Sequence, residues 1–100
     1  MLIIRDVFTA KPGQASKLAR LVKKVFGNDP SVRVMTDLVS EFNTVIMEHK
    51  VKDLAEFDEN MRLYRERKPG PKMASNAFDE MAGYTDMYLS GRREILQIVE

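Results

Sequence analysis

The side chains best suited to proton transfer in this chain are His49 and Asp6. His49 is the only histidine among 100 residues, and imidazole is the one side chain whose ordinary pKa lies near neutral pH. Asp6 lies in an apolar run near the N-terminus and shares one side of that run with Ile4 and Phe8. A carboxylate next to an imidazole can orient the ring as a general base. We therefore predict that Asp6 and His49 form a catalytic pair, provided that their strands are antiparallel neighbours.

Four other polar side chains are candidates to bind a ligand beside this pair. Tyrosines can supply hydroxyl groups at such a cleft, and an amide can supply both a donor and an acceptor. The alternative interpretation is a partly buried histidine that a neighbouring group satisfies, with the tyrosines filling the core. The candidate ligand-binding residues are Tyr64, Tyr84, Tyr88 and Asn43.

The spacing of apolar residues predicts the elements that must position these side chains. Runs rich in β-branched residues indicate strands, and apolar residues three and four positions apart indicate helices with one buried stripe. The predicted elements are strands at 2–9, 31–39, 44–51 and 93–99, and helices at 13–26, from 54 onward and at 73–82.

Several residues mark where these elements begin and end. Asp53 is a typical helix N-cap with Glu56 three positions later, which is the spacing of a capping box. The two prolines in residues 68–71 must break the helix that follows Asp53. Residues 83–91 are predicted to form a loop, and the short turn at 40–43 predicts an antiparallel hairpin.

This order of elements predicts one α+β domain over residues 1–100, of ferredoxin-like βαββα(α)β topology. Right-handed crossovers place both helical regions on the same face of a four-stranded antiparallel sheet and leave the other face bare. A half-apolar bare face is more than a sheet in water requires, so we expect a homodimer through the helix-free face. The residues expected to face the helices are Val32, Val34, Leu38, Val45, Met47, Val51, Leu96 and Ile98.

The bare face is also expected to carry charged and polar side chains. These would form ion pairs at the dimer interface or line the interior of a barrel. The residues assigned to this group are Arg5, Arg33, Glu48, Arg93 and Gln97.

The layout resembles the dimeric α+β barrel superfamily, with its NIPSNAP-like and antibiotic-biosynthesis-monooxygenase-like members. The resemblance is carried by a strand, the turn Lys11-Pro12-Gly13, an amphipathic helix, a hairpin, and the segment TVIMEHKVKDLAEF at 44–57. It implies dimerisation of two sheets into an α+β barrel and a ligand between sheet and helices. The cofactor-free monooxygenases of this layout use an Asn, a Trp and a Tyr or His, whereas this chain has no Trp.

Composition argues against several other classes of protein. The net charge of +1 predicts no strong attraction to nucleic acid or anionic membranes, and no apolar run approaches the length of a membrane span. One His and no Cys leave only carboxylates for a metal, without ligand spacing. We expect no cofactor, no nucleic-acid partner, and a cytoplasmic location, which the absence of cysteine fits.

Two functions fit the sequence. The first is a dimeric α+β barrel protein that binds or transforms a small, largely apolar molecule between sheet and helices, with monooxygenase-like or isomerase-like chemistry. The second is a non-catalytic ligand-sensing or assembly module that uses the same sheet. A cleft that holds Asp6, His49 and a tyrosine would favour the enzyme.

Overall fold

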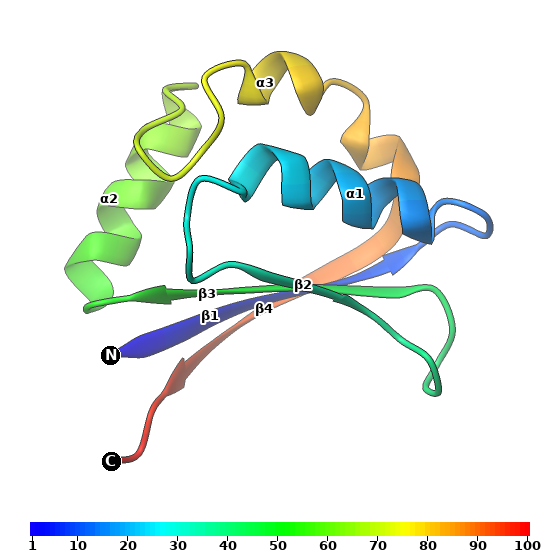
Figure 1. Cartoon of the computed structure of the whole chain (residues 1–100), viewed down its shortest axis with the longest axis horizontal. Coiled ribbons are helices and arrows are strands. Elements are labelled where there is room, and N and C mark those ends of the chain that lie inside the picture. Colours follow the sequence, from blue (N-terminus) through cyan, green and yellow to red (C-terminus); the bar gives the residue numbers. More distant parts are fainter.

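A four-stranded antiparallel sheet with all helices on one face forms the structure, a computed structural model that describes residues 1–100 (Figure 1). The strand order is β2-β3-β1-β4, which confirms the predicted α+β, ferredoxin-like topology. The elements are β1 (Leu2–Ala10), α1 (Ala15–Phe26), β2 (Arg33–Thr36), β3 (Thr44–Val51), α2 (Leu54–Arg65), α3 (Ala77–Glu80), the 3-10 helix η1 (Tyr84–Met87) and β4 (Tyr88–Gln97).

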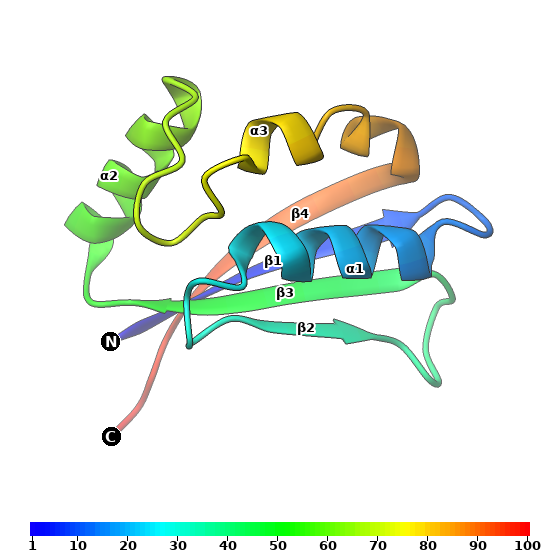
Figure 2. The ribbon, with the colours of Figure 1, turned by 45° about the horizontal axis from the view of Figure 1, so that its top comes forward.

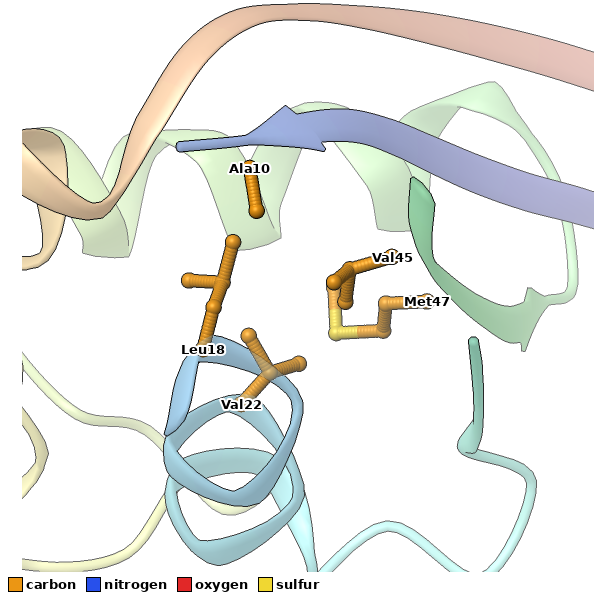
Figure 3. Packing of buried hydrophobic residues seen from close by; sticks show 5 residues of the cluster. All are labelled: Ala10, Leu18, Val22, Val45 and Met47. Carbon is orange, nitrogen blue, oxygen red and sulfur yellow. The ribbon is translucent and has the colours of Figure 1, made fainter. Parts of the chain in front are cut away.

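The main core lies between α1 and the sheet. Leu18 and Val22 on α1 point toward Val45 and Met47 on β3, and Ala10 closes the cluster from β1 (Figure 3). Leu18 and Val22 lie one turn apart, so the helix presents both of them on one stripe. Burial of this stripe is what attaches α1 to the sheet.

Helix α2 begins at the predicted cap but is packed differently from α1. The Asp53 side chain accepts a hydrogen bond from Glu56 N at 2.9 Å, and the Glu56 carboxylate accepts one from Lys52 N at 2.6 Å, so the predicted capping box forms with its second bond one residue earlier than usual. No residue of α2 is fully buried. In Figure 2 this helix stands beyond one end of α1, and the loop that leads from α2 to α3 passes between the two helices.

The helix-free face carries one row of alternating charges that crosses the whole sheet. Arg33, Glu48, Arg5 and Glu94 lie directly opposite one another on four adjacent strands. Glu48 accepts hydrogen bonds from Arg5 Nε at 2.6 Å and Arg33 Nη2 at 2.7 Å, and Arg5 Nη1 lies 3.5 Å from Glu94. Although it lies on the bare face, Glu48 is only 5% exposed, because the two arginines cover it.

The second strand is shorter than predicted, and Leu38 was wrongly assigned to the core. Strand β2 ends at Thr36, and Leu38 is 99% exposed. The Asp37 carboxylate accepts hydrogen bonds from Thr44 N at 2.9 Å and Ser40 Oγ at 3.1 Å. These bonds to its own loop start the turn at Asp37 and leave Leu38 outside the sheet.

The region after α2 also differs from the prediction. The helix predicted at 73–82 is reduced to the single turn of α3, with turns on either side. Part of the predicted loop at 83–91 is strand, because β4 already begins at Tyr88. This strand pairs with β1 along nearly its whole length. The backbone hydrogen bonds to β1 make residues 88–91 a strand, although their local sequence pattern predicts a loop.

The orientation of β4 is opposite to the one predicted. Asp6 pairs with Arg93 and Ile4 with Ile95 across the β1–β4 ladder, and directly opposite residues share a face. Arg93 therefore lies on the helix side, and Leu96 lies on the bare side. The apolar residues of this strand alone suggested that Leu96 faces the helices and Arg93 faces away. The orientation is reversed because leaving the buried Asp6 without a cation would cost more free energy than leaving Leu96 outside the core.

Glu48 provides a test of this charged row. The hydrogen bond from Arg33, with that from Arg5, holds the pKa of Glu48 below its usual 4.5, so the stabilisation is present above pH 4.5 and is lost as the pH falls through the folded-state pKa. We expect Glu48→Gln to lower the free energy of unfolding by about 1–3 kcal/mol at neutral pH. The deficit relative to wild type should shrink in acid. Urea unfolding across pH measures both effects.

Glu94→Gln is the matched control for this test, because it removes a carboxylate from the same row whose two contacts, to Arg5 at 3.5 Å and to Arg92 at 3.4 Å, are both long. Its effect should stay below about 0.5 kcal/mol. An equal loss in the two variants would contradict the special role of Glu48.

Candidate functional site

A cavity of about 220 Å³ lies between the helix side of the sheet, α1, α2 and the segment 69–73. For scale, an apolar cavity of about 150 Å³ can hold benzene, so this space suits an organic molecule of one or two rings. Fifteen of its 24 lining residues are hydrophobic, and the polar ones gather around His49. A mostly apolar wall with a few convergent polar groups is the usual form of a small-molecule site.

The cavity exists because the two long helices pack differently. Helix α1 packs directly on the sheet, whereas the inner side of α2 is separated from the sheet by the cavity. Phe57, Met61 and Tyr64 follow one helical stripe of α2, and all three line the cavity. None of them is fully buried. The predicted apolar stripe of this helix is therefore present, but it forms the wall of a cavity.

The structure brings Asp6 and His49 into one cavity without joining them by a hydrogen bond. His49 pairs with Ile4, and Asp6 pairs with Met47, so the two residues are diagonal neighbours on the same face of β1 and β3. Asp6 instead accepts a hydrogen bond from Arg93 Nε at 2.6 Å. The shared face agrees with the prediction, and the predicted dyad stays a hypothesis.

His49 is held neutral at physiological pH. Burial lowers its pKa below the usual 6.5, and the Lys72 ammonium lowers it further, against the opposing effect of Asp6 and Asp29. A neutral imidazole keeps one unprotonated nitrogen, so the ring can accept a proton. Since the folded-state pKa is depressed, folding becomes less favourable as the pH falls from 6.5 through that pKa.

A second ion pair lies on the other side of His49, between Lys72 and Asp29. Lys72 Nζ is 3.6 Å from Asp29 Oδ2 and 3.0 Å from Glu56 Oε1, and it donates a hydrogen bond to the carbonyl of Lys50 at 3.2 Å. Asp29 is 8% exposed. Burial raises its pKa, but the hydrogen bonds from Ser31 outweigh that effect, so the pKa is lowered. Lys72 thus ties segment 69–73 to β3 and to α2.

The tyrosines divide between the cavity and its border. Tyr64 and Tyr84 line the cavity, and their hydroxyl groups are hydrogen-bonded at 3.0 Å. Burial raises the pKa of Tyr84, and the bond to Tyr64 raises it further, so its hydroxyl stays protonated. Only one of the two hydroxyl protons is used between them, which leaves one for a ligand.

Two of the predicted ligand-binding residues do not line this cavity. Tyr88 packs against Phe8, with ring centroids 5.0 Å apart, at the border of the main core. Asn43 lies in the turn before β3 with φ of 56°, and its carbonyl accepts a hydrogen bond from Ala10 N at 2.7 Å. A ligand in this cavity would therefore meet neither residue.

Sequence reasoning missed three charged residues of the site: Asp29, Lys72 and Arg93. Arg93 was placed on the wrong face, and the other two lie in irregular segments whose position depends on the tertiary fold. Only the proline-rich context of Lys72 could have marked its segment as rigid.

No group of three or more acidic or histidine side chains is arranged to hold a metal ion. None of the helices has the length and apolar run needed to cross a bilayer.

Comparison with solved structures shows where this fold occurs. The chain matches a NIPSNAP family protein from Agrobacterium tumefaciens with a TM-score of 0.77 at 10% identity, covering 99% of this chain and 86% of the other. An uncharacterized NIPSNAP domain protein from Burkholderia xenovorans gives 0.71 at 12% identity, with 99% and 95% covered.

An antibiotic biosynthesis monooxygenase has the same fold, with a TM-score of 0.67 at 11% identity and full coverage of both chains. No protein-family model matches the sequence, and no curated protein is a significant match. At these identities the comparisons establish the fold, and the predicted resemblance in layout is confirmed.

The protonation state of His49 can be measured directly. We expect NMR titration of its ring to give a pKa below 6.5, since burial and Lys72 both disfavour the charged form. Lys72→Met should raise that pKa, because it removes a cation and exposes the ring to unpaired carboxylates. Lys50→Met is the control, since Lys50 points to the bare face and its side chain should not affect His49. A pKa above 6.5 in the wild type would contradict this account.

Proposed function

We propose that this protein binds a small, largely apolar molecule in the cavity and that His49 removes a proton from it. The observation that carries the proposal is a neutral imidazole in a mostly apolar cavity, between two ion pairs. A base with a pKa near or below neutral is available without prior deprotonation. The surrounding apolar wall excludes water that would otherwise compete for the proton.

The proton transfer has a simple balance. A C–H or O–H bond of the ligand breaks, an N–H bond forms on His49, and the electron pair stays on the ligand. Return of the proton to a different carbon would isomerise the ligand. When the broken bond is C–H, the electron pair of the resulting carbanion could instead reduce dioxygen: a C–O bond forms, the bound peroxide takes the proton back from His49, and loss of water breaks the O–O bond and leaves a carbonyl. This is the monooxygenase-like alternative, and monooxygenase is the activity named for one protein of the same fold.

A non-catalytic ligand-sensing role is the second candidate. It is favoured by the hydrogen bond that commits Asp6 to Arg93, because His49 is then left without a carboxylate to orient its ring. The cavity would still bind a ligand, and binding would order α2, which has no fully buried residue. The two candidates differ only in whether His49 takes up a proton from the ligand.

We also propose that the protein works as a homodimer through the bare face of the sheet. Two apolar rows flank the charged row on this face. Met35, Ile46 and Val7 form the row on one side of it, and Ile3 and Leu96 form the row on the other side. The charged row contains two arginines and two glutamates and so has no net charge of its own, and each apolar row ends in one cation, Arg92 or Lys50. An isologous contact between two such faces would bury both apolar rows.

The dimer can be tested by sedimentation at micromolar concentration. Ile46→Glu places an unpaired charge in the apolar row and should convert the dimer to a monomer. Leu54→Glu makes the same change at an exposed position on α2, and it should leave the dimer intact. A wild-type monomer at these concentrations would contradict the proposal.

Ligand binding can be followed through the methionine methyl groups. Met47, Met61, Met73 and Met81 line the cavity, whereas the other three methionines do not. With 2-tetralone, a bicyclic ketone that has acidic C–H groups, we expect NMR shifts confined to those four methyls. Asn60→Trp should fill the cavity and abolish the shifts, and Asp58→Trp, on the exposed side of the same helix, should preserve them.

The same probe tests catalysis, because loss of a proton exchanges deuterium from solvent into the ketone. We expect the wild type to accelerate this exchange and His49→Gln to lose about 100-fold of the acceleration while still binding. Binding without any acceleration in the wild type would favour the sensing role. Absence of binding would contradict both candidates.

A further inference from the structure

Arg93 presents unused hydrogen-bond donors to the cavity beside His49. Its Nε donates to Asp6 Oδ1 at 2.6 Å, while Nη1 meets only the thioether sulfur of Met61 at 3.4 Å, which is a weak acceptor. The Cζ atom of the guanidinium lies 5.8 Å from the centroid of the Phe57 ring, a cation–π contact that favours this position of the side chain. Neither Nη1 nor Nη2 donates a hydrogen bond to a carboxylate.

Lys72, the other cation of the cavity, is in the opposite situation. Its ammonium has three oxygen neighbours, from Asp29, Glu56 and the Lys50 carbonyl. Two of these oxygens lie within hydrogen-bond distance, and Asp29 Oδ2 at 3.6 Å makes an ion-pair contact only, so Lys72 already has two carboxylates and a carbonyl around its charge. An anion that enters the cavity would therefore find a less neutralised cation at Arg93, which has one carboxylate partner where Lys72 has two.

We propose that Arg93 is the anion-binding residue of this cavity and that the ligand is a small apolar molecule carrying one carboxylate. This proposal rests on the proposed function, because it concerns the ligand of the same cavity. Asp6 occupies the Nε of the guanidinium and leaves Nη1 and Nη2 free to donate two hydrogen bonds. Planar carboxylates are the groups that this fork of donors matches best.

The charges around the site limit how strong this preference can be. Asp6 already neutralises Arg93, so a carboxylate gains directed hydrogen bonds and a near cation without a net positive field. The neutral His49 can add one N–H donor. The ring of Phe57 and the side chain of Met61 give the apolar body of the ligand a surface beside its charged end. We expect a preference of about tenfold over a neutral analogue, in the range of one charge-assisted contact.

A matched pair of compounds tests this preference. 2-Naphthoate and 2-naphthamide share the same rings and differ in the charge of the head group. We expect both to shift the four cavity methionine methyls, with 2-naphthoate binding about tenfold more tightly. Arg93→Gln should bring the two affinities within twofold, and the ratio of the two within the same variant is the quantity that tests the preference. Arg93→Lys, which keeps the charge but loses the fork, should retain part of the preference.

Arg92→Gln is the control, because Arg92 is the adjacent residue on the opposite face and pairs only with Glu94. It should keep the full preference for 2-naphthoate. Equal affinities in the wild type, or a preference that survives in Arg93→Gln, would overturn the role of Arg93 while leaving cavity binding in place. Failure of both compounds to shift the cavity methyls would overturn the proposed function together with this inference.

Discussion

The ion pair between Asp6 and Arg93 determines how the sheet is completed and what the cavity contains. Asp6 is 7% exposed on a middle strand, and a carboxylate buried there must be paired. On β4 the residue directly opposite Asp6 is Arg93. That pairing turns β4 so that Arg93 faces the helices, and it places a guanidinium at the edge of a mostly apolar cavity. Because the Asp6 carboxylate accepts its hydrogen bond from Arg93, it does not hydrogen-bond to His49.

The same requirement governs the other face, with a different result. Glu48 is as well buried as Asp6, and it is held by two arginines from the strands on either side. Here the pairing builds a row of alternating charges instead of a cavity wall, because the neighbours of Glu48 in the ladder are all charged. Each face of the sheet thus contains one buried carboxylate, and in each case its partners fix which strand residues lie opposite.

The sequence predicted the elements whose apolar period is strong and whose ends are chemically marked. Helix α1, strand β3 and the Asp53 cap fall within about two residues of their predicted positions. Local pattern failed where long-range pairing decides the structure. Strand β4 begins five residues earlier than expected because β1 provides a partner, and its orientation follows Asp6, which lies 87 positions away in sequence from Arg93. The site divides in the same way: strand alternation placed His49 and Asp6 on one face, but it carries no information about segment 69–73.

The unequal packing of the two long helices explains why the site lies where it does. Helix α1 fills its half of the sheet with Leu18 and Val22, whereas α2 presents its apolar stripe to a cavity and has no fully buried residue. In a domain of this size the burial of each side chain contributes a considerable part of the free energy of unfolding. The apolar stripe of α2 faces a cavity, so the chain lacks the stabilisation that burial of this stripe would give. A molecule that fills the cavity would recover that stabilisation by removing apolar surface from water. If the proposed function holds, binding and the packing of α2 would therefore be coupled, and the charges around His49 would select the molecule that gains this energy.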